Sequence, residues 1–159
     1  MHPLGDVLIV LIQTTFPIIS AIQILSFVAE INRTTMAGAG RLIHAGTQEA
    51  LLYRVRWCSS FVCKLRGLMF RRSLLPGEGL LMVESSASRM GAAIHMLFVF
   101  FPIAVVWMDD EFRVVDMAYA RPWRILYAPA RAARYTLEAE PALLNHVQVG
   151  DILRYEEQS

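Results

Sequence analysis

Short runs of apolar residues, bounded by turn residues, follow one another from residue 49 to the end of the chain. In residues 49–57 (EALLYRVRW) the side chains of Tyr53, Val55 and Trp57 alternate with arginines, which is the period of a half-exposed β-strand. β-Branched and aromatic residues between turn residues predict four more strands. These strands are expected at residues 80–83, 112–119, 134–140 and 152–155.

Residues 90–108 (MGAAIHMLFVFFPIAVVWM) form a longer stretch without a charged side chain. We interpret it as two buried strands, because Phe, Val, Ile and Trp dominate it and Pro102 divides it into halves of strand length. Asp109, Asp110 and Glu111 then supply a turn before the next predicted strand. Both faces of the two strands are apolar, which is typical of the middle of a packed sheet.

Two short helical turns and a long loop complete the outline. Ser59 or Ser60 can cap a short helix that ends near Met69. Its apolar face would consist of Phe61, Leu65 and Leu68. Pro141 can start a second short turn, and residues 120–132 are expected to form an ordered loop. About seven short strands with one or two short helices predict a mainly β (α+β) domain with antiparallel pairing, either a compact sandwich or a partly open barrel.

The N-terminal part of the chain has a different character. Residues 7–29 carry no charged side chain and are bounded by Asp6 and Glu30, so this run of 23 residues is long enough to span a bilayer as a helix. No Lys or Arg precedes the run, whereas Arg33 and Arg41 follow it, so the positive-inside rule would place the following domain in the cytoplasm. We therefore expect a single N-terminal membrane anchor.

Two alternatives to the anchor stay open. The small residues 37–39 would suit cleavage of a secretory signal, and the chain could also start at Met36 as a soluble cytoplasmic protein. The domain organisation expected from the sequence has three parts. Residues 1–31 are a transmembrane anchor, or an untranslated or cleaved segment, residues 32–48 are a linker, and residues 49–157 are the β domain.

Composition narrows the class of protein. A chain of 159 residues favours one domain, and 55% hydrophobic with 18% charged residues excludes a disordered or collagen-like protein. The net charge of only +1 gives no reason to expect a nucleic-acid partner. Cys58 and Cys63 have no second cysteine pair and no nearby His, so we interpret them as two buried thiols rather than a zinc site or a disulfide framework.

Several short motifs occur in one order between residues 49 and 156. They are Arg66-Gly67-Leu68-Met69-Phe70-Arg71, the Gly-Glu-Gly-Leu-Leu-Met run at residues 77–82, Ile94-His95-Met96, Phe101-Pro102-Ile103, Leu137-Glu138 and Gly150-Asp151. The series resembles the bacterial and archaeal domain-of-unknown-function family one-nine-two. The resemblance implies a compact, mostly β fold and no established activity, cofactor or partner. It also implies an export or anchor segment, which many relatives carry at the N-terminus.

The chain departs from that family pattern in the central strand. Ala104 stands where relatives often carry an aspartate, two residues after the proline. A polar site that relatives build on that aspartate would therefore be absent from this chain.

His95 is the main candidate for chemistry or ligand binding. A lone imidazole in an apolar strand must either find hydrogen-bond partners or be tuned for use. Asp116 and Glu138 each lie in an otherwise apolar strand, and the fold could bring either carboxylate near His95 as an acid and base pair. The alternative is structural: a satisfied core or rim histidine, with carboxylates that pair with Arg113 and Arg134.

Three further residues are candidates for ligand or partner binding. Arg66 precedes a glycine at a helix end, so its guanidinium could hold an anion or the last helix carbonyls. Trp123 and Arg124 lie in the predicted loop, where they could line a binding site or seal the end of the sheet. The sequence contains no phosphate-binding glycine loop, nucleophile elbow, HExxH or paired CxxC motif, so no cofactor and no metal site is predicted.

Three functional hypotheses follow from the sequence. In the first, a membrane-tethered small β domain acts as an accessory module that binds an unidentified small ligand or protein. In the second, the protein is an enzyme of unassigned reaction that uses His95 with Asp116 or Glu138. In the third, it is a soluble cytoplasmic structural domain that starts at Met36.

Overall fold

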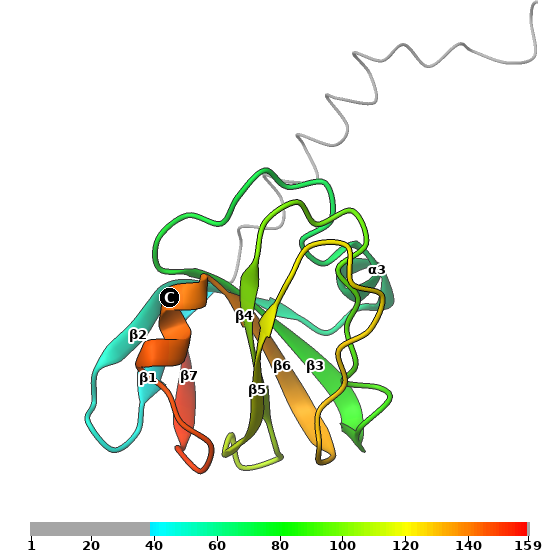
Figure 1. The fold of residues 1–159 in the computed structure, drawn as a ribbon. Helices are drawn as coiled ribbons and strands as arrows, with labels where there is room; N and C mark the ends of the chain where they lie inside the picture. Colours follow the sequence, from blue (N-terminus) through cyan, green and yellow to red (C-terminus); the bar gives the residue numbers. More distant parts are fainter. Residues whose placement is uncertain (1–38, 159) are drawn as a thin grey trace, which may run out of the picture. The chain divides into compact units, whose positions relative to one another are not determined.

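The computed structural model describes residues 39–158, and the structural statements below concern this part of the chain. It contains seven strands, one α-helix and one 3₁₀ helix, which confirms the mainly β class (Figure 1). The strands are β1 (Ala39–His44), β2 (Ala50–Cys58), β3 (Glu78–Ser88), β4 (Ile103–Met108), β5 (Val114–Ala120), β6 (Ala133–Ala139) and β7 (Leu153–Glu157). The helices are α3 (Phe61–Arg66) and η1 (Pro141–Asn145).

The seven strands form one sheet in the order β5-β4-β6-β3-β2-β1-β7. Five of the six neighbouring pairs are antiparallel, and the sixth, β2 with β3, is parallel. A parallel pair requires a crossover connection, and α3 lies in that connection. Because there is a single sheet, the predicted sandwich is wrong, while the prediction of largely antiparallel pairing is confirmed.

The sheet curls until its two edge strands, β5 and β7, meet at one end. There the N–H of Val114 donates to the carbonyl of Asp151 at 2.8 Å, and the N–H of Gly150 donates to the carbonyl of Val114 at 2.8 Å. The N–H of Leu153 donates to the carbonyl of Phe112 at 3.0 Å. The sheet is therefore an open, curled half-barrel, in agreement with the predicted partly open barrel.

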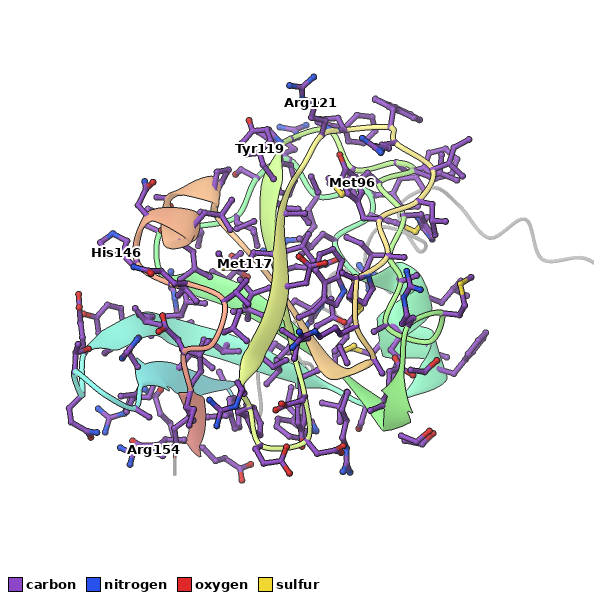
Figure 2. All side chains as sticks on the ribbon, turned by 60° about the horizontal axis from the view of Figure 1, so that its bottom comes forward. Met96, Met117, Tyr119, Arg121, His146 and Arg154 are labelled. Carbon is purple, nitrogen blue, oxygen red and sulfur yellow. A yellow bond between two sulfur atoms is a disulfide. The ribbon has the colours of Figure 1, made fainter. Side chains whose placement is uncertain are left out.

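Both faces of the central strands are covered. Val106 and Met108 of β4 belong to an apolar cluster inside the curl, whereas Val105 and Trp107 belong to a second cluster on the outer face. Side chains fill the space around the strands throughout (Figure 2). Every residue of β4 is buried, which confirms the prediction that both of its faces are apolar.

The first half of the uncharged stretch, residues 90–101, is a loop and not the predicted strand. Ile94 makes only a single β-bridge, with Tyr127. The side chains of Ile94, Met96 and Val99 are nonetheless buried, because this loop packs on the outer face of the sheet and joins the outer cluster. The apolar composition thus indicated correctly that these residues are buried. The predicted strand is absent, because the residues lack the backbone pairing of a strand.

The sheet begins earlier than expected. β1 lies within residues 32–48, which the sequence assigned to a linker, and it pairs with both β2 and β7. Leu42 and Ile43 are buried, and Leu42 belongs to the apolar cluster inside the curl. A six-residue strand that opens with Ala and Gly shows too few apolar positions for the alternation of a strand to be recognised.

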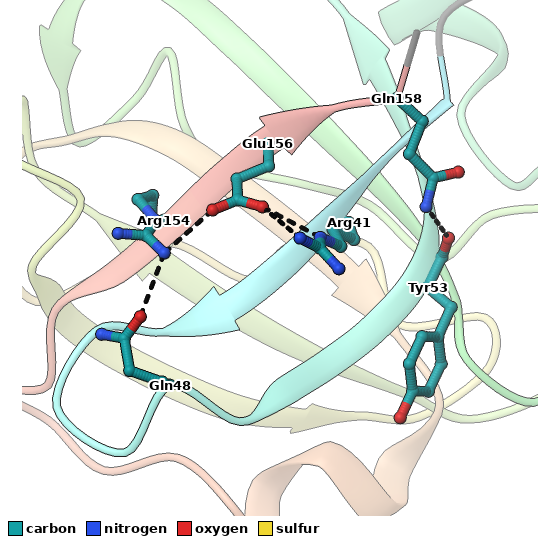
Figure 3. A network of polar contacts seen from close by, with 6 residues as sticks. All are labelled: Arg41, Gln48, Tyr53, Arg154, Glu156 and Gln158. Atoms are coloured by element: carbon teal, nitrogen blue, oxygen red, sulfur yellow. Dashed lines mark hydrogen bonds and ion pairs between the residues drawn. The ribbon is translucent and has the colours of Figure 1, made fainter.

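Polar contacts fasten the outside of β1 to β7 (Figure 3). The guanidinium of Arg41 lies 2.7 Å from the carboxylate of Glu156, which also contacts Arg154 at 2.8 Å. Arg154 in turn donates to Gln48 at 3.1 Å. Exposed ion pairs of this kind contribute about 0–1 kcal/mol, so apolar burial rather than this network places β1.

The predicted helix is present, but its surroundings differ from the expectation. Ser60 is the N-cap, since its hydroxyl accepts the N–H of Cys63 at 3.3 Å. Phe61 and Leu65 are exposed instead of forming a buried face with Leu68, and only Leu68, beyond the helix end, is buried. The six-residue helix therefore borders a cavity in the surface and does not pack flat on the sheet.

Cys58 and Cys63 form a disulfide, so the prediction of two thiols is wrong. Cys58 ends β2 and Cys63 lies in α3, and the chain reversal between them brings their Cα atoms to 5.7 Å. This separation lies in the usual range for a disulfide. A spacing of five residues reveals such a pair only when the turn between the two elements is known.

The other predicted elements are confirmed with shifted ends. The strands expected at residues 112–119, 134–140 and 152–155 correspond to β5, β6 and β7, and Pro141 begins η1. The strand expected at residues 80–83 is the centre of the longer β3.

Within residues 39–158 no helix is both long and apolar enough to cross a membrane. Residues 7–29, on which the predicted anchor depends, lie outside the described residues, as does Met36. The anchor, the cleaved segment and the alternative start therefore stay predictions.

Candidate functional site

A cavity of about 450 Å³ lies on the outer face of the sheet, between α3 and the loop of residues 91–99. Its floor is formed by β3 and β6, and its walls by α3 with the turn that follows it. Residues with polar or ionisable side chains on its lining are Ser59, Lys64, Arg66, Glu84, His95, Thr136 and Glu138. The rest of the lining is mostly apolar, as in pockets that hold small organic molecules.

Two features fix the wall formed by α3. The disulfide between Cys58 and Cys63, the third residue of the helix, joins β2 to α3. At its end, Gly67 adopts a φ of 45° and its N–H donates to the carbonyl of Cys63 at 2.8 Å. A side chain is strained in this left-handed conformation, so the sequence needs glycine here to turn the chain back along the cavity.

The opposite wall is fixed by one carbonyl group. The carbonyl of Ala92 accepts the indole N–H of Trp107 at 2.8 Å and the hydroxyl of Thr136 at 3.3 Å. Trp107 and Thr136 belong to β4 and β6, so the loop is attached to the floor of the cavity. This attachment sets the positions of Ile94 and His95 on the cavity lining.

Glu138 of β6 is the most unusual residue of the floor. Only 5% of it is exposed, and its Oε2 atom has no hydrogen-bond partner within the described part of the chain. A Cβ atom placed on Gly67 would lie 3.9 Å from Oε2, so this oxygen lies directly below the turn after α3. Burial raises the pKa of the Glu138 carboxyl to about 7, and the positive charge of Arg56 acts in the opposite direction.

Arg56 and Glu138 are related through the strand register. Arg56 of β2 pairs with Leu80 of β3, and Leu80 pairs with Glu138, so the three residues form a row across the sheet. Two strand spacings amount to roughly 10 Å at the backbone. Burial, and then the nearby charges of Arg71 and Arg66, lower the pKa of the Arg56 guanidinium. A group of arginines therefore lies beside the buried carboxylate.

The rim of the cavity carries charge and exposed apolar side chains. Lys64 and Glu84 form an ion pair at 2.9 Å, and both line the cavity. Phe61 and Leu65 are exposed on the helix side. His95 is an exposed loop residue and not the imidazole within a strand that the sequence predicted.

The structure brings three of the six predicted site residues together. His95, Arg66 and Glu138 all line the cavity, although they come from a loop, a helix end and a strand. Asp116 does not line it. The carboxylate of Asp116 accepts the N–H of Ala130 at 2.7 Å, as well as that of the following residue at 2.8 Å.

The other two predicted residues, Trp123 and Arg124, lie in the loop after β5 and do not line the cavity. The guanidinium of Arg124 lies 4.7 Å from the centre of the Tyr127 ring. Ala104, the departure from the family pattern, is buried in the inner cluster and also does not line the cavity.

Sequence reasoning missed Gly67, Lys64 and Glu84 as cavity residues. Lys64 and Glu84 carried a signal in principle, since each is a charged residue beside apolar ones in an element of its own. Their pairing depends on the crossover between β2 and β3, which the sequence does not specify. Among residues 39–158 no group of three or more His, Cys, Asp or Glu side chains is placed to hold a metal ion.

A family model for uncharacterised proteins, DUF192, matches residues 42–155 of the chain. The chain is 35% identical over 104 residues to UPF0127 protein TK1120 of Thermococcus kodakarensis, and the match spans 64% of each chain. It is 35% identical over 103 residues to UPF0127 protein PH1112 of Pyrococcus horikoshii, which covers 64% of this chain and 86% of that one. These sequence relatives are archaeal.

Two solved bacterial structures are similar in fold. One is a putative transcription regulator from Sinorhizobium meliloti, with a TM-score of 0.64 and 20% identity over 74% of this chain and 92% of that chain. The other is a protein of unknown function from Novosphingobium aromaticivorans, with the same TM-score and identity over 76% of this chain and 96% of that chain. At 20% identity the likeness supports the fold alone.

Proposed function

We propose that this chain, which belongs to the uncharacterised DUF192 family, binds a small organic ligand in the cavity above Glu138. The ligand presents an ammonium group or another hydrogen-bond donor to Glu138 Oε2. One observation carries the proposal: Oε2 is buried and has no hydrogen-bond partner among the described residues. Because an unsatisfied buried polar atom costs about 1–3 kcal/mol, a bound donor recovers free energy that the unliganded protein lacks.

The dimensions and lining of the cavity agree with this proposal. A volume of about 450 Å³ lies within the range of small-molecule pockets, which is roughly 300–1,000 Å³. Leu68, Ile94 and Val99 supply apolar surface for the body of the ligand. The carboxylate then fixes its orientation, since a charge-assisted hydrogen bond is stronger than a neutral one.

A titration with simple probes tests the proposal on the full chain labelled with ¹⁵N. We expect n-butylammonium to shift the amide resonances of Gly67, Gly91 and Ala92, and 1-butanol to shift them much less. Glu138→Gln should weaken butylammonium binding at least tenfold, because the variant has no charge to offer. Glu49→Gln, which removes an exposed carboxylate outside the cavity, should bind as the wild type does.

The pH dependence provides a second readout. Since the Glu138 pKa is about 7, butylammonium binding should strengthen between pH 6 and pH 8 as the carboxylate ionises. Equal shifts with butanol and butylammonium, or unchanged binding by Glu138→Gln, would contradict the proposal.

Acid–base catalysis in the same cavity is the second candidate function. A carboxyl with a pKa of about 7 can exchange a proton efficiently near neutral pH, and His95 lines the same cavity. The pairing of His95 with Asp116 has no such support, because the Asp116 carboxylate is engaged by backbone N–H groups. A hydrolysis assay with p-nitrophenyl acetate tests the idea: loss of turnover in Glu138→Gln supports it, and wild-type turnover in that variant removes it.

The membrane tether is a separate part of the proposal and depends on residues 7–29. It predicts that the full chain stays with membranes in alkaline carbonate. Clean release of the chain under these conditions would exclude the tether and leave the cavity proposal unaffected.

A further inference from the structure

Three loops gather at one end of the sheet, at the top of the view in Figure 1. They comprise residues 68–77, 96–102 and 121–127. We call the exposed face of these three segments the loop surface. It is distinct from the floor of the cavity, and it carries Trp123 and Arg124, which the sequence offered as candidates for ligand or partner binding.

Backbone hydrogen bonds hold the three loops together. The N–H of Phe70 donates to the carbonyl of Phe98 at 2.9 Å. The N–H of Met96 donates to the carbonyl of Arg124 at 2.8 Å, and the N–H of Trp123 donates to the carbonyl of Met96 at 3.0 Å. The loop surface is therefore a connected platform rather than three independent segments.

Four aromatic side chains form the centre of the loop surface. They are Phe70, Phe98, Phe100 and Trp123, with exposed fractions of 67%, 42%, 54% and 51%. The ring centres lie 5.2 Å apart for Phe70 and Phe98, 5.7 Å for Phe98 and Trp123, and 5.5 Å for Phe100 and Trp123. A continuous cluster of exposed rings of this kind marks an interaction surface, unlike single exposed apolar residues.

The backbone conformation sets these rings apart from ordinary loop residues. Phe70, Phe98 and Trp123 have φ values of 62°, 60° and 66°, in the left-handed region that large side chains rarely adopt. Strained backbone of this kind persists where the surrounding structure enforces it, and it is concentrated at functional sites. Here it accompanies rings that face solvent instead of a core.

Three aliphatic side chains, Leu75, Ile125 and Leu126, are also exposed on these loops. Figure 2 shows Tyr119, which is also exposed, beside Arg121 at this end of the molecule.

The charge of the loop surface has a single sign. The three segments contain no Asp or Glu and four arginines. Arg71 pairs with Glu78 at 2.8 Å. The other three, Arg72, Arg121 and Arg124, take part in no ion pair within residues 39–158. The loop surface is therefore positively charged, whereas the whole chain has a net charge of only +1.

We infer that the loop surface docks onto an anionic lipid bilayer. Trp and Phe side chains are favoured at the boundary between headgroups and acyl chains, and aliphatic side chains insert beside them. Guanidinium groups around the rings reach the lipid phosphates, which they can bind through two hydrogen bonds. The surface combines both requirements on loops that the backbone holds in place.

A single-stranded nucleic acid also binds aromatic rings and arginines, but it fits this surface less well. Bases stack on ring faces along a basic groove. Leu75, Ile125 and Leu126 offer no such stacking surface, whereas the interior of a bilayer accommodates them. The aliphatic part of the loop surface thus favours lipid.

Tryptophan quenching by lipids with brominated acyl chains tests the inference on the full chain. One set of vesicles contains phosphatidylcholine alone, and the other contains equal parts of phosphatidylcholine and phosphatidylglycerol. We expect strong quenching with the anionic vesicles and weak quenching with the neutral ones. Trp123→Phe should lose most of this quenching, since Trp107 is buried in the outer cluster, Trp57 lies in β2, and only Trp123 lies on the loop surface. Brominated acyl chains quench only tryptophans that lie close to them. Quenching of Trp123 therefore reports membrane contact through the loop surface and not contact through residues 7–29.

Charge neutralisation tests the electrostatic part. Arg121→Gln should weaken binding to anionic vesicles about fivefold, the effect of one basic residue at an anionic membrane surface. Arg154→Gln is the matched control, because Arg154 lies at the opposite end of the molecule (Figure 2). This variant should bind the vesicles as the wild type does. In the wild type, added salt should weaken the binding, a readout that needs no variant.

Three results would overturn the inference. The first is equal quenching in the wild type and in Trp123→Phe, which would place the contact elsewhere on the chain. The second is equal binding to neutral and anionic vesicles. The third is tight binding of a single-stranded oligonucleotide without any lipid quenching, which would assign the loop surface to nucleic acid.

Discussion

The buried carboxyl of Glu138 makes the stability of the protein depend on pH in an unusual direction. Its pKa is about 7 in the folded protein against 4.5 for the ordinary group, with burial as the cause. The folded state therefore holds a proton that the unfolded state has lost between these two values. By linkage, the stabilising contribution is fully present below pH 4.5 and is lost as pH rises to 7, opposite to the usual behaviour of carboxylates.

The magnitude follows from the two pKa values. A difference of one in pKa corresponds to about 1.4 kcal/mol, so the difference of about 2.5 is worth about 3 kcal/mol. Glu138→Gln keeps the shape of the side chain and removes the titration. At pH 4 the variant should be about as stable as the wild type, and at pH 8 it should be more stable by about 3 kcal/mol.

Urea unfolding of the full chain, followed by intrinsic tryptophan fluorescence, measures this difference at a series of pH values. Comparing the wild type with the variant cancels every other titrating group. Glu49→Gln, with its exposed side chain, should keep the pH dependence of the wild type. A stability difference between the wild type and Glu138→Gln that stays constant from pH 4 to pH 8 would refute the reasoning.

Three further predictions concern the walls of the cavity and the loop after β5. Replacing Cys58 and Cys63 together by Ser should lower the free energy of unfolding by about 2 kcal/mol, measured in urea, because a short closed loop no longer restricts the unfolded chain. The same variant should weaken butylammonium binding, since α3 is released from β2. Gly67→Ala should cost about 1 kcal/mol because of its φ of 45°, measured by thermal unfolding. Asp116→Ala should lower the free energy of unfolding by about 2 kcal/mol and accelerate hydrogen exchange at the Ala130 amide, without changing butylammonium binding.

Local pattern was sufficient for strands that alternate or are rich in β-branched residues. β5, β6 and β7 were predicted because their side chains report strand propensity directly. β1 was not, since its neighbours β2 and β7 supply the pairing partners that make it a strand. Residues 90–101 show the converse, because a loop that covers a sheet face needs the same apolar side chains as a buried strand.

In the candidate site, too, the sequence predicted some features and missed others. Glu138 and Asp116 looked alike in the sequence, each a single carboxylate within an apolar strand. They differ because Glu138 lies on the outer face of a central strand beneath α3, whereas Asp116 lies on the edge strand, where two backbone N–H groups reach it. Residue type identified the candidates, but only the order of strands in the sheet decides which carboxylate is buried without a partner.

The disulfide and the charge pattern lead to opposite expectations for the compartment of the domain. Arg33 and Arg41 would keep the domain on the cytoplasmic side of a membrane. Disulfides such as Cys58–Cys63 persist in oxidising compartments and are rare in the cytoplasm, except in hyperthermophiles. We expect the pair to be oxidised in living cells, which favours export over a cytoplasmic position. Trapping free thiols by alkylation in intact cells, followed by mass spectrometry of the peptide that contains both cysteines, measures this directly. Alkylation of both cysteines would contradict the expectation that the pair is oxidised, and it would remove this argument for export.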